Sequence, residues 1–159
     1  IKYLCETLRM YDVYVSADVY GIVISSKIDA AAVGQDYKEM SRYLDYICPM
    51  IYPSHYGFGY AGIPYPDKEP AKIIKMALNS SNKRIGEIPE YQHRAICRPW
   101  LQDFTASYLG TKNGEDRYLV YDAEVLRIQM EATYESGLTD WLLWNAGGSY
   151  TEDAWLPKE

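Results

Sequence analysis

The fold is decided by the stretch Arg94-Ala95-Ile96-Cys97-Arg98-Pro99-Trp100, an apolar run that ends at Arg98-Pro99-Trp100 and is followed by Gln102 and Asp103. A continuous apolar run with polar residues at its end is typical of a buried strand in a parallel sheet. Three other segments repeat this pattern, at residues 13–18, 46–52 and 141–145. The sequence therefore predicts four such strands, near 13–18, 46–52, 94–100 and 141–145.

Helical patterns alternate with these strands. The apolar spacing predicts helices over residues 2–10, 35–46, 70–79 and 122–136, and residues 147–159 read as an irregular tail. Between residues 53 and 70 the many Gly and Pro residues predict a long loop, of a length that is more often functional than idle. The order α-β-α-β-α-β-α-β gives an α/β fold with a parallel sheet and right-handed crossovers.

Two parallel architectures compete for this order. A doubly wound sheet usually carries a Gly-rich phosphate turn after an early strand, but no G-x-G-x-x-G or G-K-[ST] motif occurs here. A (β/α)₈ barrel instead places functional side chains after several strands, and the strand ends here carry Asp, Tyr, His, Arg, Trp and Asn. A complete barrel needs about 250 residues and eight strands. The 159 residues and the four predicted strands are too few for a complete barrel.

Composition narrows the range of partners. A net charge of -6 with no clustered basic face argues against nucleic acid, and no apolar run approaches the length of a membrane span. The chain has 17 Tyr and 4 Trp but only 2 Phe, so most rings combine a flat apolar face with a polar group, which suits sugars. The alternative is that Tyr replaces Phe at half-buried edges of the core. Three cysteines without Cys-x-x-Cys or Cys/His spacing predict neither a metal site nor a cofactor.

The strand-end motifs resemble those of a family of putative glycosyl hydrolases first catalogued as a domain of unknown function. They are Ser16-Ala17-Asp18-Val19-Tyr20-Gly21, Pro49-Met50-Ile51-Tyr52-Pro53-Ser54-His55-Tyr56, Arg98-Pro99-Trp100-Leu101-Gln102-Asp103-Phe104 and Trp141-Leu142-Leu143-Trp144-Asn145-Ala146. The resemblance covers nearly the whole chain and implies a TIM barrel related to the glycosidases.

In that family the four strands would be the fifth to eighth of the barrel. The resemblance therefore implies that residues 1–159 form a single partial domain, the C-terminal half of a (β/α)₈ barrel. The earlier strands, with an Asp-Tyr-[hydrophobic]-Arg-Phe-Pro motif expected on the fourth, are not in this sequence. A chain that starts at Ile1 without an initiator Met is expected to be a fragment or a processed piece. The resemblance also implies an extracellular or cell-surface location.

Glycoside hydrolysis usually needs two carboxylic groups that flank the scissile bond. Asp18 and Asp103 are the candidate catalytic residues, because both follow strands at the expected catalytic rim. Each has a structural alternative. Asp18 could bond neighbouring backbone or an Arg, and Asp103 could pair with Arg98 or cap the following turn.

Other strand-end residues could bind the sugar. Hydrogen bonds to hydroxyl groups are expected from five side chains, and stacking of a sugar ring from two indoles: Tyr52, His55, Arg98, Gln102 and Asn145, with Trp100 and Trp144. A lone His is more often structural, and Trp144 could instead fill the centre of the barrel.

These observations lead to two functional hypotheses from different classes. The first is the C-terminal half of a glycoside-hydrolase barrel that acts on a polysaccharide. The second is a carbohydrate-binding or structural fragment without catalysis; a barrel hydrolase acting on a non-sugar substrate is a weaker third reading. Four parallel strands leave two open edges and an apolar inner face, so we expect self-association or pairing with the missing N-terminal half.

Overall fold

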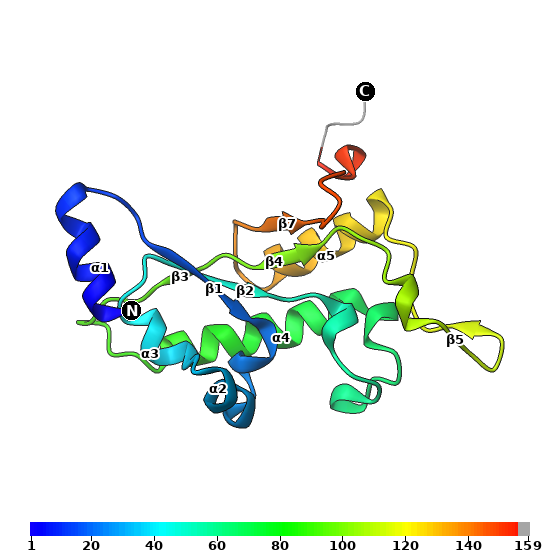
Figure 1. The fold of residues 1–159 in the computed structure, drawn as a ribbon, viewed down its shortest axis with the longest axis horizontal. Coiled ribbons are helices and arrows are strands. Elements are labelled where there is room, and N and C mark those ends of the chain that lie inside the picture. Colours follow the sequence, from blue (N-terminus) through cyan, green and yellow to red (C-terminus); the bar gives the residue numbers. More distant parts are fainter. Residues whose placement is uncertain (156–159) are drawn as a thin grey trace. The chain divides into compact units, whose positions relative to one another are not determined.

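The computed structural model describes residues 1–155, so the end of the predicted tail, residues 156–159, lies outside the described part. The chain divides into two compact units. The first unit contains Ile1–Met50 and Ala77–Pro99, and the second contains Ile51–Met76 and the chain from Trp100 onward. Figure 1 colours the chain by its position in the sequence, from the blue N-terminus to the red C-terminal segment.

The first unit is built on three parallel strands. Strand β1 (Ser16–Tyr20) pairs with β2 (Tyr46–Met50), and β2 also pairs with β3 (Ile96–Cys97). The register places Asp18 opposite Cys48. The helices α1 (Lys2–Leu8), α2 (Lys27–Val33) and α3 (Tyr37–Ser41) belong to this unit, together with the second half of α4 (Pro70–Gly86).

Tyr37 is the largest side chain buried in the core of the first unit. Its hydroxyl lies 2.7 Å from Ser81 Oγ and 3.5 Å from Cys97 Sγ, so the ring packs inside while its polar end keeps partners. The helix that carries it starts at Asp36, whose carboxylate accepts a hydrogen bond from Glu39 N at 3.0 Å. Asp36 is thus the N-cap of α3.

The second unit contains the parallel pair β4 (Trp100–Gln102) and β7 (Leu142–Trp144), with Gln102 opposite Trp144. Helix α5 (Ala123–Glu135) begins at Asp122, whose carboxylate accepts hydrogen bonds from Glu124 N and Val125 N. Its buried face contains Leu126, Gln129, Met130, Ala132 and Thr133. The expected helix over 122–136 therefore forms nearly to its predicted ends.

An antiparallel hairpin lies between β4 and α5. It consists of β5 (Thr111–Lys112) and β6 (Glu115–Asp116), and Figure 1 shows it as a projecting loop. Its turn residues Asn113 and Gly114 have φ angles of 56° and 83°, and Asn-Gly is the pair that two-residue hairpin turns favour.

Several boundaries differ from the sequence prediction. The strand expected over residues 94–100 is divided into β3 and β4, because Pro99 has no N–H to donate to a ladder. Strand β1 begins at Ser16, while Val13 and Tyr14 are exposed before it. Helix α2 lies in a segment for which no helix was predicted, and Ser26 Oγ caps it by accepting a hydrogen bond from Asp29 N.

The long loop after β2 contains short 3-10 turns at Pro53–His55, Tyr60–Gly62 and Pro66–Lys68. After β7 the chain is irregular apart from a 3-10 turn at Glu152–Ala154. In the part of the chain that the structure describes, none of the helices combines the length and the apolar character needed to cross a membrane.

Candidate functional site

The residues predicted to form the site are distributed over both units. Asp18 and Arg98 belong to the first unit, whereas the second contains Tyr52, His55, Trp100, Gln102, Asp103, Trp144 and Asn145. The second unit brings its members together because the loops that follow β2, β4 and β7 all contribute to it.

Two indole rings lie next to each other on the paired strands of the second unit. Trp100 starts β4 and Trp144 ends β7, and their ring centroids are 6.0 Å apart at an interplanar angle of 89°. Such an edge-to-face pair is a favourable arrangement for aromatic rings. Trp144 is exposed over 43% of its surface, so part of its ring can contact a ligand.

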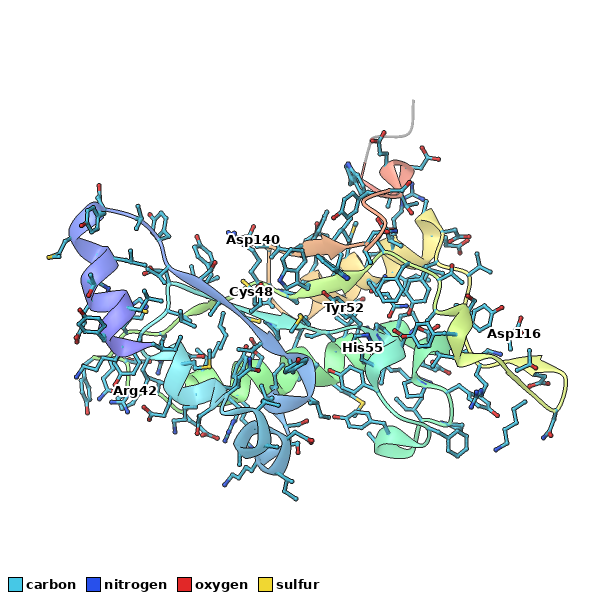
Figure 2. The ribbon with its side chains drawn as sticks, in the orientation of Figure 1. Arg42, Cys48, Tyr52, His55, Asp116 and Asp140 are labelled. Carbon is cyan, nitrogen blue, oxygen red and sulfur yellow. The ribbon has the colours of Figure 1, made fainter. Side chains whose placement is uncertain are left out.

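Tyr52 and His55 form a second aromatic pair at the start of the loop after β2. Their rings meet edge to face with centroids 5.0 Å apart, and Figure 2 shows the two labelled side chains close together. Tyr52 is buried, and its ring also contacts Phe104 at 6.0 Å. His55 is exposed, yet partial desolvation lowers the pKa of its imidazole below the ordinary value. At neutral pH His55 is therefore mostly uncharged and can both donate and accept a hydrogen bond.

Gln102 is at the centre of a buried hydrogen-bond network. The side chain is fully buried; its Oε1 accepts hydrogen bonds from Ser54 N at 3.1 Å and Ser54 Oγ at 2.8 Å. Its Nε2 donates to Asp67 Oδ1 and to the Phe104 carbonyl, each at 3.0 Å. The Gln129 side chain bonds both the N–H and the carbonyl of Gln102. All four hydrogen-bonding positions of the Gln102 amide are used by the protein.

Asp103 is also buried, with 2% of its surface exposed. Its Oδ1 accepts a hydrogen bond from Thr151 Oγ1 at 2.7 Å, and its Oδ2 accepts one from Thr151 N at 3.0 Å. Asn145 also contacts Asp103, because its Nδ2 donates a hydrogen bond to the Asp103 carbonyl. Its Oδ1 accepts a hydrogen bond from Gly147 N. These contacts attach the segment after β7 to the end of β4.

In the first unit Asp18 and Arg98 lie on either side of Cys48. Asp18 is in the middle of β1, on the exposed face that also includes Ser16 and Tyr20, and the Arg98 guanidinium lies 4.0 Å from the centre of the Tyr46 ring. Burial raises the pKa of the Cys48 thiol to about 11, with Asp18 raising it further and Arg98 lowering it. Both charges are thus close enough to affect the same thiol.

The sequence analysis missed Asp67, a carboxylate buried in the long loop. It is 1% exposed, and its two oxygens accept hydrogen bonds from Gln102 Nε2 and from Leu119 N at 3.0 Å. Burial raises the pKa of this carboxyl group above its ordinary value, against the lowering effect of its hydrogen bonds. Its only signal in the sequence is an Asp after Pro66 in a loop rich in Pro and Gly, which is the usual composition of a solvated turn.

The family model described as "Putative glycosyl hydrolase domain" matches residues 1–150. The chain belongs to this family. A search of the curated proteins returned no match.

Among solved structures, the chain is similar to the glycoside hydrolase domain of PgaB (BpsB) from Bordetella bronchiseptica. The TM-score is 0.52 at 16% sequence identity, and the match covers 90% of this chain and 36% of that chain. This similarity concerns the fold. It confirms the predicted α/β class with parallel strands and fits part of a (β/α)₈ barrel. The match spans about a third of the length of the PgaB chain.

Metal ligands were not expected from the sequence. Within residues 1–155, the structure contains no group of three or more His, Cys, Asp or Glu side chains that could hold a metal ion.

Proposed function

We propose that the chain is the C-terminal part of a glycoside hydrolase barrel that acts on a polysaccharide. The observation that carries this proposal is the Trp100–Trp144 pair, which places a partly exposed indole at the end of β7 within a fold of the glycoside hydrolase type. A flat aromatic face binds the apolar face of a sugar ring, and the neighbouring polar groups then select its hydroxyl positions. Membership of the glycosyl hydrolase family supports the same substrate class.

The accessible side chains of the predicted set are the ones we assign to the sugar. In the second unit Trp144 provides the stacking surface and His55 supplies hydrogen bonds to hydroxyl groups. In the first unit we assign Arg98 to hydrogen bonds of the same kind. Gln102 is fully buried, and Asn145 bonds the backbone through both ends of its amide, so we assign these two residues to positioning the loops.

The two candidate carboxylates have different roles in this proposal. Asp18 is on the exposed face of β1, so its carboxyl group can reach solvent or a substrate and is our candidate general acid or base. Asp103 accepts two hydrogen bonds from Thr151 and is our candidate positioning residue, which fixes the segment next to Trp144. A hydrolase needs a second carboxyl group as well, and we expect it from the upstream part of the barrel.

Substitution of the two aspartates separates these roles. We expect Asp18→Asn in the full-length protein to lower kcat on the polysaccharide that is hydrolysed by about 10²-fold or more, with the thermal unfolding midpoint unchanged. Asp103→Asn should lower both the unfolding midpoint and the activity, because one Thr151 contact is lost. Hydrolysis assays on a panel of glucans, chitin, xylan and mannan, with calorimetry on the same variants, measure both effects. An Asp18→Asn protein with unchanged kcat would remove Asp18 from the mechanism.

The stacking role of Trp144 is tested on the same panel. Trp144→Ala should raise KM by about tenfold while kcat changes less, because it removes contact area from the bound sugar and not a reacting group. Tyr91→Ala is the control, since Tyr91 is also exposed but lies in the first unit. A KM equal to that of the wild type would show that the indole does not contact the substrate.

A second candidate function is carbohydrate binding without catalysis. The burial of Asp103 and its two hydrogen bonds to Thr151 favour this alternative, because a carboxylate held in this way is poorly placed to exchange protons with a substrate. Glycan-array binding with no release of reducing sugar, under conditions where the upstream half of the barrel is present, would favour binding over hydrolysis.

We also propose that the chain is completed by further strands. Among the described residues β1 pairs only with β2, and β7 pairs only with β4, so each has an open edge. An upstream half of the barrel, or a second copy of this chain, could cover these edges.

A further inference from the structure

A small hollow in the second unit lies outside the strand-end site. It is formed by the loop after β2 and by the base of the β5–β6 hairpin, and has a cavity volume of about 50 Å³. Its lining includes Tyr56, Phe58, Tyr65, Asp67, Leu109 and Arg117, and we call it the Tyr56 hollow. Three aromatic rings and two charged side chains in one concave place are typical of a site for a small polar group with an apolar edge.

Two residues that line the Tyr56 hollow each carry a buried polar atom with no protein partner among residues 1–155. The two atoms are the hydroxyl of Tyr56 and Nε of Arg117. Tyr56 as a whole is only 8% exposed. A buried polar group without a hydrogen bond costs stability, and such groups are rare in native proteins. Burial raises the pKa of Tyr56 far above its ordinary value, so the phenol remains protonated and able to donate.

Both donors are held in place by their surroundings. The Tyr56 ring contacts the Tyr60 ring, with centroids 4.8 Å apart. Arg117 N donates to the Gly110 carbonyl at 3.0 Å, at the base of the hairpin. Gly110 has a φ of +66°, a conformation that a residue with Cβ seldom adopts, so this closure of the hairpin favours glycine. The hairpin is also anchored to the loop, because Lys112 lies 4.8 Å from the Phe58 ring and Lys68 Nζ donates to the Asp116 carbonyl.

The charges around the hollow favour a neutral ligand. Arg117 contributes a positive charge and Asp67 a negative one to the same lining. Each oxygen of Asp67 already accepts one hydrogen bond, from Gln102 or from Leu119, and the negative charge of the carboxylate opposes an anionic ligand. The free groups are donors, and they require an acceptor such as a hydroxyl, ring or carbonyl oxygen.

We propose that the Tyr56 hollow is a secondary subsite that receives one polar substituent of a neutral carbohydrate, with Tyr56 and Arg117 donating hydrogen bonds to it. The volume admits a substituent or an edge of a sugar, and Phe58 and Tyr65 provide the apolar contact beside it. This inference rests on the proposed function, since it takes the ligand to be a carbohydrate. The hollow is made by loops that follow β2 and β4, the same loops that carry His55 and Asp103.

Binding measurements on four variants test this subsite. Neutral hexasaccharides (cello-, laminari-, malto- and chitohexaose) are titrated into the whole chain by isothermal calorimetry, with oligogalacturonate as an acidic probe. We expect Tyr56→Phe and Arg117→Met each to weaken binding of the preferred neutral sugar by about tenfold. The controls Tyr91→Phe and Lys72→Met change exposed residues outside the hollow and should bind as the wild type does.

A stability readout separates lost contacts from damage to the fold. The unfolding midpoint of Tyr56→Phe without sugar should be equal to or above that of the wild type, because the variant loses only an unpartnered hydroxyl. Equal affinity of all variants, no binding by any neutral sugar, or preference for oligogalacturonate would each overturn the subsite. Binding that depends on Tyr56 and Arg117, without hydrolysis by the full-length protein, would support the subsite and overturn the hydrolase function. Hydrolysis that is lost in Asp18→Asn but unaffected in Tyr56→Phe would support the hydrolase function and overturn the subsite.

Discussion

At the scale of single residues, Gln102 determines how two loops of the second unit are joined to β4. Replacing it by Leu keeps similar volume but leaves Ser54 N, Ser54 Oγ and Asp67 Oδ1 without their partner. We expect Gln102→Leu to lower the free energy of unfolding by about 2–4 kcal/mol, because buried polar groups that lose a partner cost about 1–3 kcal/mol each.

Urea unfolding measures this loss. Gln35→Leu is the matched control, since Gln35 Oε1 accepts one exposed hydrogen bond from Tyr20 N, and we expect a change below about 1 kcal/mol. A loss in Gln102→Leu no larger than in the control would mean that the network does not stabilise the loops.

His55 makes the stability of the chain depend on pH. Because burial lowers its pKa in the folded chain below 6.5, the unfolded chain binds a proton at higher pH than the folded chain does. The contribution of His55 to stability is therefore fully present above pH 6.5 and is lost as the pH falls through 6.5 toward the folded pKa. Wild type should lose stability relative to His55→Gln over this range. NMR titration of the imidazole and urea unfolding at several pH values measure it, and a folded pKa above 6.5 would contradict it.

At the scale of elements, α5 depends on a local signal at its first residue. The Asp122 carboxylate accepts hydrogen bonds from Glu124 N and Val125 N, both at 3.0 Å. We expect Asp122→Ala to lower the free energy of unfolding by about 1 kcal/mol, the usual cost of an N-cap. Glu131→Ala, on the exposed face of the same helix, should change it by less than about 0.5 kcal/mol. Thermal unfolding of both variants by circular dichroism compares them; equal midpoints would count against the cap.

The segment after β7 depends instead on a contact between residues far apart in sequence. Thr151 donates to Asp103 through its hydroxyl and its N–H, 48 residues apart along the chain. Thr151→Val preserves the shape of the side chain but removes the hydroxyl donor. We therefore expect faster hydrogen exchange of the backbone N–H at position 151 and a free energy of unfolding lower by about 1–2 kcal/mol. Thr7→Val, which removes an exposed hydroxyl bond in α1, is the control. Unchanged exchange at Thr151 would show that the Asp103 contact does not hold the segment.

At the scale of the whole molecule, open strand edges and exposed apolar residues lead to a prediction about association. Tyr20 ends β1 with 52% exposure, on the edge strand of the first unit. We expect the isolated chain to associate at micromolar concentration, because an unprotected edge pairs with another strand. Tyr20→Lys should shift the sedimentation profile toward monomer, while Tyr91→Lys in a loop should not. A wild-type chain that is monomeric and unfolds cooperatively would contradict this prediction.

Local features of the chain can be predicted from its sequence alone. Apolar runs predicted β2 and β7, and Asp122 with the spacing of Val125, Ile128 and Ala132 predicted α5, because these signals depend on neighbours in the chain. The motif resemblance predicted the family, which is confirmed. The division of the third strand at Pro99 could have been read from the missing N–H, but the apolar run around it concealed the signal.

Only the tertiary structure decided which polar side chains are free to act. Gln102, Asp103 and Trp144 all come at strand ends and look alike in sequence, yet the first two are buried with protein partners and the third is exposed. Asp67 gave no signal beyond the Pro and Gly composition of its loop. The physical reason is that burial and hydrogen-bond pairing depend on groups brought from distant parts of the chain, such as Thr151 to Asp103 and Leu119 to Asp67.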